Sequence, residues 1–215
     1  MARVILIRHG ESEANRDGRS LGRADSPLTE RGRRQVAALG RALAREPIGR
    51  VLSSPLRRAA DAAAAVAAPH SLEVETCDGL IEMEVGEMEG LPWAEARARF
   101  AAFLDRWMTD ESATLPMPGG ESLADVQRRA WPVIAPFFAA SRPDAPSGAP
   151  AETTVVVSHN FVIKTLLCAA LHLDLACWRR FEADLTGRTV LESRRGLTVL
   201  RTLNDVSHLP PDLRG

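Results

Sequence analysis

This chain of 215 residues contains no long apolar run. Its first residues, Met1-Ala2-Arg3, lead into only four strongly apolar residues before Arg8, which is not the pattern of a secretory signal peptide. No apolar stretch approaches the roughly 20 residues that a membrane-spanning helix needs. We therefore expect a cytoplasmic protein without a membrane partner.

Cysteine and lysine are scarce, and the charges nearly balance. The three cysteines are odd in number and form no CxxC pair, which is typical of free thiols in a reducing compartment. The formal net charge of −1 provides no overall field that would attract nucleic acid. Lys164 is the one lysine among 27 basic residues, and the arginine bias is compatible with a phosphate site. No HExxH or comparable ligand spacing occurs, so we expect neither a metal nor another cofactor.

Strand and helix patterns alternate along the chain, which favours an α/β fold. Short runs rich in β-branched residues predict strands, and apolar residues at helical spacing predict helices. We predict strands at 4–7, 51–52, 72–76 and 153–157, helices from Thr29 to before Pro47, from Ser54-Pro55 to Ala68, and at 93–108, 122–137 and 161–173, and a late hairpin of 189–192 with 197–202. This order predicts a three-layer α/β/α sandwich with a mostly parallel mixed sheet, as a single domain over 1–215. Residues 141–152 are predicted to form an exposed connection between the helix at 122–137 and the strand at 153–157.

Two of the predicted buried strands end in histidine. Arg8-His9-Gly10 follows the first strand, and Ser158-His159 follows the strand at 153–157. A lone histidine is usually structural, but two at the carboxyl ends of parallel neighbours meet where open α/β sheets bind ligands. Gly10 allows a tight turn or a close approach to a ligand. The sequence therefore predicts an imidazole beside an anion-binding guanidinium.

Arg57 and Arg58 stand in the first turn of a predicted helix, where the helix dipole disfavours cations by some tenths of a kcal/mol. Solvated surface arginine is the ordinary explanation, and it suits one of the two. A local rule broken without visible gain often marks a functional site. An arginine there can join the helix N–H groups in binding a phosphate.

Several short motifs together resemble the histidine phosphatase superfamily, which includes the phosphoglycerate mutases. In chain order they are Arg8-His9-Gly10-Glu11-Ser12 with Asn15, Pro27-Leu28-Thr29, Ser53 to Ala59, Leu80-Ile81-Glu82, Pro118 to Ser122, Ser158-His159, and Leu203-Asn204-Asp205 with His208. The resemblance spans nearly the whole chain and implies a phosphoglycerate mutase-like fold. It also implies a site that works through a phosphohistidine.

The resemblance assigns a role to each matching residue. It makes His9 the nucleophile, Glu82 the acid and base, and Arg8, Arg58 and His159 the groups that hold the phosphoryl group. Arg58 is preferred to Arg57 because the family pattern places arginine two residues after Leu56. The expected substrate-binding residues are Arg8, Asn15, Gly22, Arg58, His159 and Asn160.

Two positions depart from the family pattern. Asn160 stands where many members have glycine, and Leu21 stands where mutases commonly have a small polar residue. The second departure weakens the case for mutase-like substrate contacts. Residues 82–121 are expected to form a cap over the site.

The chemistry sets two conditions on these residues. The His9 ring must be neutral, with one nitrogen held as a donor by an acceptor such as a carbonyl near Gly10. Glu82 must be protonated to assist the leaving oxygen, so its pKa must be raised by burial or by acids such as Glu84, against the effect of the arginines.

A metal-independent phosphomonoesterase acting on a small phosphorylated metabolite is the leading hypothesis. Phosphoglycerate mutase-type transfer, a catalytically idle phosphate-binding module and a metal hydrolase are the alternatives. The family's mutases carry a longer insertion after the acid/base loop, whereas Arg97, Arg99 and Arg106 here read as ion-pair partners of Glu95 and Asp110. The substrate stays open, and a homodimer is expected by family analogy only.

Overall fold

The computed structural model describes residues 2–139, 153–194 and 197–214. A mixed sheet of six strands lies at its centre, in the order β3-β2-β4-β1-β5-β6. Neighbours are parallel from β3 to β1 and antiparallel from β1 to β6. The strands are β1 (Ala2–Arg8), β2 (Ile48–Ser53), β3 (Val74–Thr76), β4 (Thr153–Ser158), β5 (Arg188–Arg194) and β6 (Leu197–Asp205). The predicted mostly parallel mixed sheet is confirmed.

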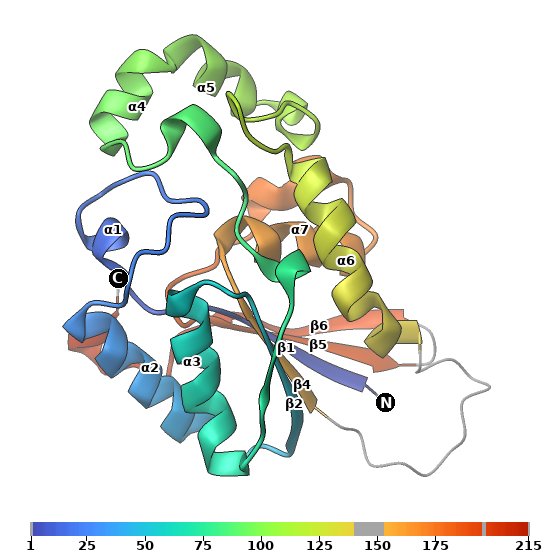
Figure 1. Ribbon diagram of the computed structural model, residues 1–215. Helices are drawn as coiled ribbons and strands as arrows, with labels where there is room; N and C mark the ends of the chain where they lie inside the picture. Colours follow the sequence, from blue (N-terminus) through green and yellow to red (C-terminus); the bar gives the residue numbers. More distant parts are fainter. Residues whose placement is uncertain (1, 140–152, 195–196, 215) are drawn as a thin grey trace.

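Helices cover both faces of this sheet, with α2 and α3 on one side and α6 and α7 on the other (Figure 1). The α-helices are α1 (Glu13–Arg16), α2 (Glu30–Leu43), α3 (Arg57–Ala67), α4 (Trp93–Arg99), α5 (Ala101–Trp107), α6 (Leu123–Ala139) and α7 (Asn160–Ala170). Short 3-10 turns are η1 (Ala68–His70), η2 (Asp78–Leu80), η3 (Gly86–Met88), η4 (Asp110–Ala113), η5 (Leu175–Arg180) and η6 (Pro211–Leu213). None of these described helices has the length and apolarity to cross a bilayer.

The central strand β1 divides the interior into two apolar cores. Val4 and Leu6 pack into the core that contains α6 and α7, while Ile5 and Ile7 pack into the core that contains α2 and α3. Side chains alternate between the faces of a strand, so a continuous apolar run serves both cores at once. This arrangement is the predicted three-layer sandwich.

Local capping signals set the starts of two helices as the sequence predicts. The Thr29 hydroxyl accepts a hydrogen bond from the Gly32 N–H and begins α2. Ser122 and Asp125 exchange side-chain and backbone hydrogen bonds before α6. Each pairing satisfies an amide that has no partner within the helix.

Two predicted helices differ from the observed ones. α3 begins at Arg57 with Leu56 as its N-cap, so Ser54-Pro55 lies before the helix. The predicted helix over 93–108 is divided into α4 and α5, because Phe100 leaves the helical conformation with φ −114° and ψ 26°. The residues 141–152 and the hairpin turn 195–196 lie outside the described residues.

The arginines of this region also take partners other than those predicted. Arg99 pairs with Glu87 at 3.3 Å, and Arg106 pairs with Glu111 at 2.7 Å, in place of Glu95 and Asp110. Glu87 belongs to η3 and Glu111 to η4, so spacing along one helix does not predict these pairs.

Candidate active site

The two strand-end histidines meet at the carboxyl edge of the sheet. β1 and β4 are parallel neighbours with Arg8 opposite Ser158, and the His9 N–H donates to the Ser158 carbonyl at 3.1 Å. As a result the rings of His9 and His159 lie side by side, with their centroids 5.1 Å apart. The juxtaposition predicted from matching strand ends is present.

The His9 ring is held in one tautomer and kept neutral. Only 3% of His9 is exposed, and Nδ1 lies 2.7 Å from the Gly10 carbonyl oxygen. An oxygen acceptor at that distance requires Nδ1 to carry the proton, so the lone pair is on Nε2. Burial, with help from Arg58 and Arg8, holds the pKa of His9 well below its ordinary value. The ring is therefore an uncharged base near neutral pH.

Arg58 is fully buried against this ring. Its Nε lies 3.3 Å from His9 Nε2, while its two terminal nitrogens donate to the carbonyls of Ala24 and Gly22, both at 2.7 Å. These bonds fix the plane of the guanidinium. Arg57 is exposed, and its backbone N–H donates to Asp25. Of the two neighbouring arginines, the structure brings Arg58 to His9.

Arg8 and His159 complete the polar surroundings of His9. Arg8 donates to the Ala183 carbonyl at 2.8 Å, and His159 Nε2 lies 2.8 Å from the Ser54 hydroxyl oxygen. Burial is the main cause that lowers the pKa of both side chains. Within the described part of the chain, Arg8 Nε and His159 Nδ1 are buried without a hydrogen-bond partner. Such atoms carry a desolvation cost that a bound anion can offset.

The position of Ser54 explains why α3 starts later than predicted. Its hydroxyl lies against His159 and also accepts a weak hydrogen bond from the Leu56 N–H at 3.3 Å. Sequence spacing suggests a helix cap at this serine, because a cap is the commonest local use of Ser before Pro. The contact cannot be predicted locally, because His159 follows β4 and lies 105 positions away in the sequence.

Glu82 is a buried carboxyl with a raised pKa. It is 4% exposed, and its oxygens accept from the Met83 N–H at 2.8 Å and the Phe161 N–H at 3.4 Å. Burial raises the pKa of Glu82 more than these N–H groups and the two site arginines lower it. Glu84 was expected to help raise the pKa of Glu82, but it is not among the groups that shift this pKa. Glu84 turns outward and pairs with Arg23 at 3.2 Å.

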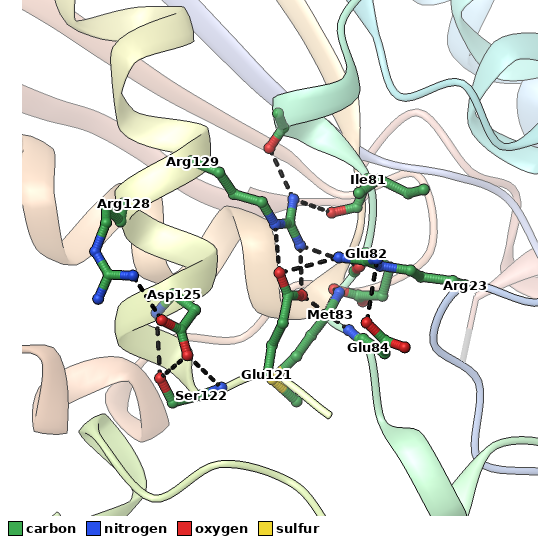
Figure 2. A network of polar contacts seen from close by, with 11 residues as sticks. Arg23, Ile81, Glu82, Met83, Glu84, Glu121, Ser122, Asp125, Arg128 and Arg129 are labelled. Carbon is green, nitrogen blue, oxygen red and sulfur yellow. Dashed lines mark hydrogen bonds and ion pairs between the residues drawn. The ribbon is translucent and has the colours of Figure 1, made fainter. Parts of the chain in front are cut away.

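A network of polar contacts around Arg129 holds the loop that carries Glu82 (Figure 2). Arg129 donates to the carbonyls of Gly79, Ile81 and Glu82 at 2.9, 2.6 and 3.1 Å. Its guanidinium also forms two hydrogen bonds, of 2.9 and 3.0 Å, with the Glu121 carboxylate. One side chain of α6 thus holds three backbone carbonyls within the four residues 79–82.

Glu121 links the same network to two further segments. It pairs with Arg23 at 3.0 Å and accepts from the Glu84 N–H at 3.0 Å (Figure 2). Sequence reasoning gives Arg129 no role, because an arginine within an amphipathic helix carries no signal of what its side chain contacts. Glu121 belongs to a motif of the resemblance, but the motif alone assigns it no function.

A small cavity of about 130 Å³ lies over His9. Most of the residues expected at the site line it, and Arg19, Leu21, Trp93 and Phe161 line it as well. The full lining is Arg8, His9, Asn15, Arg19, Leu21, Arg58, Glu82, Trp93, Asn160 and Phe161. Sequence reasoning missed Arg19 and Phe161.

Two of the expected substrate-binding residues are not among those that line this cavity. Gly22 supports Arg58 through its carbonyl, and its N–H donates to Glu89 at 2.9 Å. A Cβ at Gly22 would lie 2.5 Å from the Met83 carbonyl oxygen, so a side chain there is excluded. His159 contacts His9 and Ser54 beside the cavity. Both residues are placed to position other site groups.

Comparison with known proteins places this geometry in a family. The model of the histidine phosphatase superfamily (branch 1) matches residues 4–206. The chain belongs to this superfamily. Within the described ranges, no group of three or more histidine, cysteine, aspartate or glutamate side chains is arranged to hold a metal ion.

Several relatives of this histidine phosphatase are named as phosphatases. Phosphoserine phosphatase 1 of Hydrogenobacter thermophilus is 34% identical over 97% of this chain and 95% of its own length. A bifunctional protein of Mycobacterium tuberculosis is 37% identical over 96% of this chain, which spans 55% of that longer protein. The solved mycobacterial glucosyl-3-phosphoglycerate phosphatase with VO3 has a TM-score of 0.84 at 30% identity, covering 95% of this chain and 99% of the other. The predicted family, fold and phosphatase class are confirmed.

Proposed function

We propose that this protein removes the phosphoryl group from a small phosphomonoester through a phosphohistidine at His9, without a metal. The observation that carries the proposal is the uncharged His9 ring, with Nδ1 bonded to Gly10 and Nε2 beside the buried Arg58. A neutral nucleophile avoids repulsion by the doubly negative phosphate. A buried carboxyl, Glu82, lines the same cavity.

In the first step, His9 Nε2 attacks phosphorus and the bond from phosphorus to the ester oxygen breaks. Glu82 gives its proton to the departing oxygen, which leaves as an alcohol. Arg8 and Arg58 balance the charge that spreads over the equatorial oxygens, and His159 adds a hydrogen-bonding group beside His9. These cations are fixed by bonds to backbone carbonyls, so they need little rearrangement during the reaction.

In the second step, water replaces the alcohol. The Glu82 carboxylate takes a proton from that water, whose oxygen attacks phosphorus as the bond from phosphorus to His9 Nε2 breaks. Inorganic phosphate leaves, and both His9 and Glu82 return to their starting protonation states. A raised pKa suits a carboxyl that must act as acid and base in turn.

We further propose that residues 82–121 cap this site within a single domain. The segment supplies Glu82 at its beginning and Trp93 at the start of α4, and both residues line the cavity. Figure 1 shows α4 and α5 on the same side of the molecule as α1, beyond the sheet. The cytoplasmic location and the homodimer stay predictions.

A panel of phosphorylated metabolites assayed with excess chelator tests the proposed function. O-phosphoserine and sugar phosphates belong in the panel, together with the two isomers of phosphoglycerate. We expect release of inorganic phosphate at the same rate with and without chelator. Loss of activity in chelator would support a metal hydrolase. Interconversion of the phosphoglycerates without phosphate release would support the mutase alternative.

The neighbouring arginines provide a matched pair of variants. We expect Arg58→Ala to lower kcat/KM by about 10²–10³-fold, because it removes a fixed cation from the transferring group. Arg57→Ala removes an equal charge from the neighbouring residue, whose side chain is exposed. We expect this variant to change kcat/KM by less than about threefold. Steady-state kinetics with one ester measures both. Equal losses in the two variants would contradict the assignment of Arg58.

Arg129 is expected to act as a positioning residue for Glu82. Arg129→Ala removes the donor of three loop carbonyls and two hydrogen bonds to the Glu121 carboxylate, so we expect about 1–3 kcal/mol of lost stability and roughly tenfold lower kcat. The matched control Arg128→Ala removes an exposed arginine next to it. Urea unfolding and the pH dependence of kcat measure the effects. A purely structural role would lower stability but leave the pH profile of the folded variant unchanged.

A further inference from the structure

A second, larger cavity adjoins the cavity over His9. Its volume is about 410 Å³, within the range of small-molecule sites. Leu21, Trp93 and Phe161 line both cavities, so the two share a wall. We call the larger cavity the apolar groove. Besides the shared residues, α5 lines it with Ala101, Leu104 and Trp107, and Met108 lines it just after that helix.

The groove is lined mainly by apolar side chains. Its enclosed polar groups are the buried Ser20 and the indole N–H of Trp107, which has no hydrogen-bond partner among the described residues. Its charged lining residues, Arg97 and Asp105, are exposed. Large apolar side chains at its edge remain in solvent, since Trp93 is 46% exposed and Met108 is 60% exposed. A soluble protein gains little from such exposure unless a ligand covers the side chains.

The position of the groove identifies what covers it. When the phosphoryl group lies at His9, the ester oxygen lies near Glu82, and the organic part of the substrate extends beyond the small cavity. The groove of about 410 Å³ is the larger neighbouring space, since the cavity that shares Arg8 and Asn15 with the small one measures about 200 Å³. Resting on the proposed function, we propose that the substrate is a phosphomonoester of an alcohol bearing a bulky apolar group, and that this group lies in the apolar groove.

The same lining disfavours a leaving group that is strongly charged. The ammonium and carboxylate of a phosphorylated amino acid would find no buried charged partner among the residues that line the groove, and burial of charge without such a partner is costly. A phenyl-sized group gains instead from burial against Leu21, Trp93 and Phe161. The substrate class thus differs from the phosphoserine in the name of one relative.

Three esters of primary alcohols test the proposal: ethyl phosphate, 2-phenylethyl phosphate and O-phosphoserine. The first two differ only by a phenyl group. We expect kcat/KM for 2-phenylethyl phosphate to exceed that for ethyl phosphate by about 10–100-fold, through burial of the ring. O-phosphoserine should be no better than ethyl phosphate. A ratio near one between the first two, or a preference for O-phosphoserine, would overturn the proposal.

Two exposed alanines at the start of α5 supply matched variants. Ala101 lines the groove and Ala102 does not. We expect Ala101→Gln to reduce the phenyl preference at least about fivefold, because a polar chain then occupies the groove. Ala102→Gln places the same side chain on the same helical turn, and the preference should persist. Equal effects of both variants would contradict the assignment of the groove.

Binding without turnover separates this proposal from the proposed function. Ethylphosphonate and 2-phenylethylphosphonate cannot be hydrolysed, and the indoles of Trp93 and Trp107 in the groove report on binding by fluorescence. Tighter binding of the phenyl compound by about tenfold or more supports the groove even if no ester is hydrolysed. Equal binding of the two phosphonates overturns it even if hydrolysis is observed.

Discussion

Replacing His9 with alanine is expected to lower kcat by at least about 10⁴-fold while leaving the fold intact. The variant lacks the Nε2 lone pair that would form the phosphoryl bond, and removal of a nucleophile costs far more than removal of a supporting group. Arg58 and Arg8 remain, so substrate still binds. Rapid-quench kinetics and circular dichroism, measured on the same preparation, check both parts of this expectation.

The covalent intermediate gives a second readout for His9. Brief reaction of the wild-type protein with a ³²P-labelled ester, followed by quenching, should trap a phosphoenzyme that is stable in base and labile in acid. His9→Ala should trap none. The control is His70→Gln. His70 forms a hydrogen bond with the Leu43 carbonyl and does not line the cavity over His9. Normal turnover by His9→Ala would contradict the phosphohistidine mechanism, because the ring would then not be needed for catalysis.

Replacing Glu82 with glutamine is expected to lower kcat/KM for alkyl esters by about 10²–10⁴-fold. The amide keeps the size and burial of the carboxyl but cannot give a proton to the leaving oxygen. An aryl ester such as 4-nitrophenyl phosphate has a leaving group that needs little protonation, so its phosphorylation step should lose much less. The matched control is Glu84→Gln in the same loop, where the exposed side chain pairs with Arg23.

The pH dependence of activity tests the role of Glu82 further, because the raised pKa predicts the direction in which activity changes with pH. Because burial raises the pKa of Glu82, the protonated form persists above the ordinary range near 4.5. Activity on alkyl esters should therefore fall as the pH rises through that raised pKa, since the acid form is then lost. This alkaline limb should vanish in Glu82→Gln. If the limb persists there, another group supplies the proton.

The sequence predicted the principal residues of the candidate site in two ways. Some of these residues stand at strand ends and helix starts, and the family resemblance then assigned their roles. Arg8-His9 and Ser158-His159 each follow a buried β-branched run, and parallel pairing of those runs brings the histidines together. The odd placement of an arginine at a helix start drew attention to Arg57 and Arg58. Family spacing then selected Arg58, and the structure brings that residue to His9.

Contacts between distant segments could not be anticipated in the same way. Arg129 reaches loop carbonyls nearly 50 positions earlier in the chain, and its identity within α6 is the same as that of an ordinary surface arginine. Ser54 looks like a helix cap but contacts His159, and Gly22 looks like a pocket residue but supports Arg58. Local patterns record burial and backbone preference, whereas these roles depend on a partner elsewhere in the sequence.

By itself, the sequence determined the layered α/β architecture and the meeting of His9 and His159 at the ends of neighbouring parallel strands. These follow from alternation along strands and from local backbone rules, which act over a few residues. Only the tertiary structure decided the raised pKa of Glu82, the network of Arg129 and the apolar groove beside Trp93. Each of these depends on how tightly separate segments exclude water, and that is a property of packing in three dimensions.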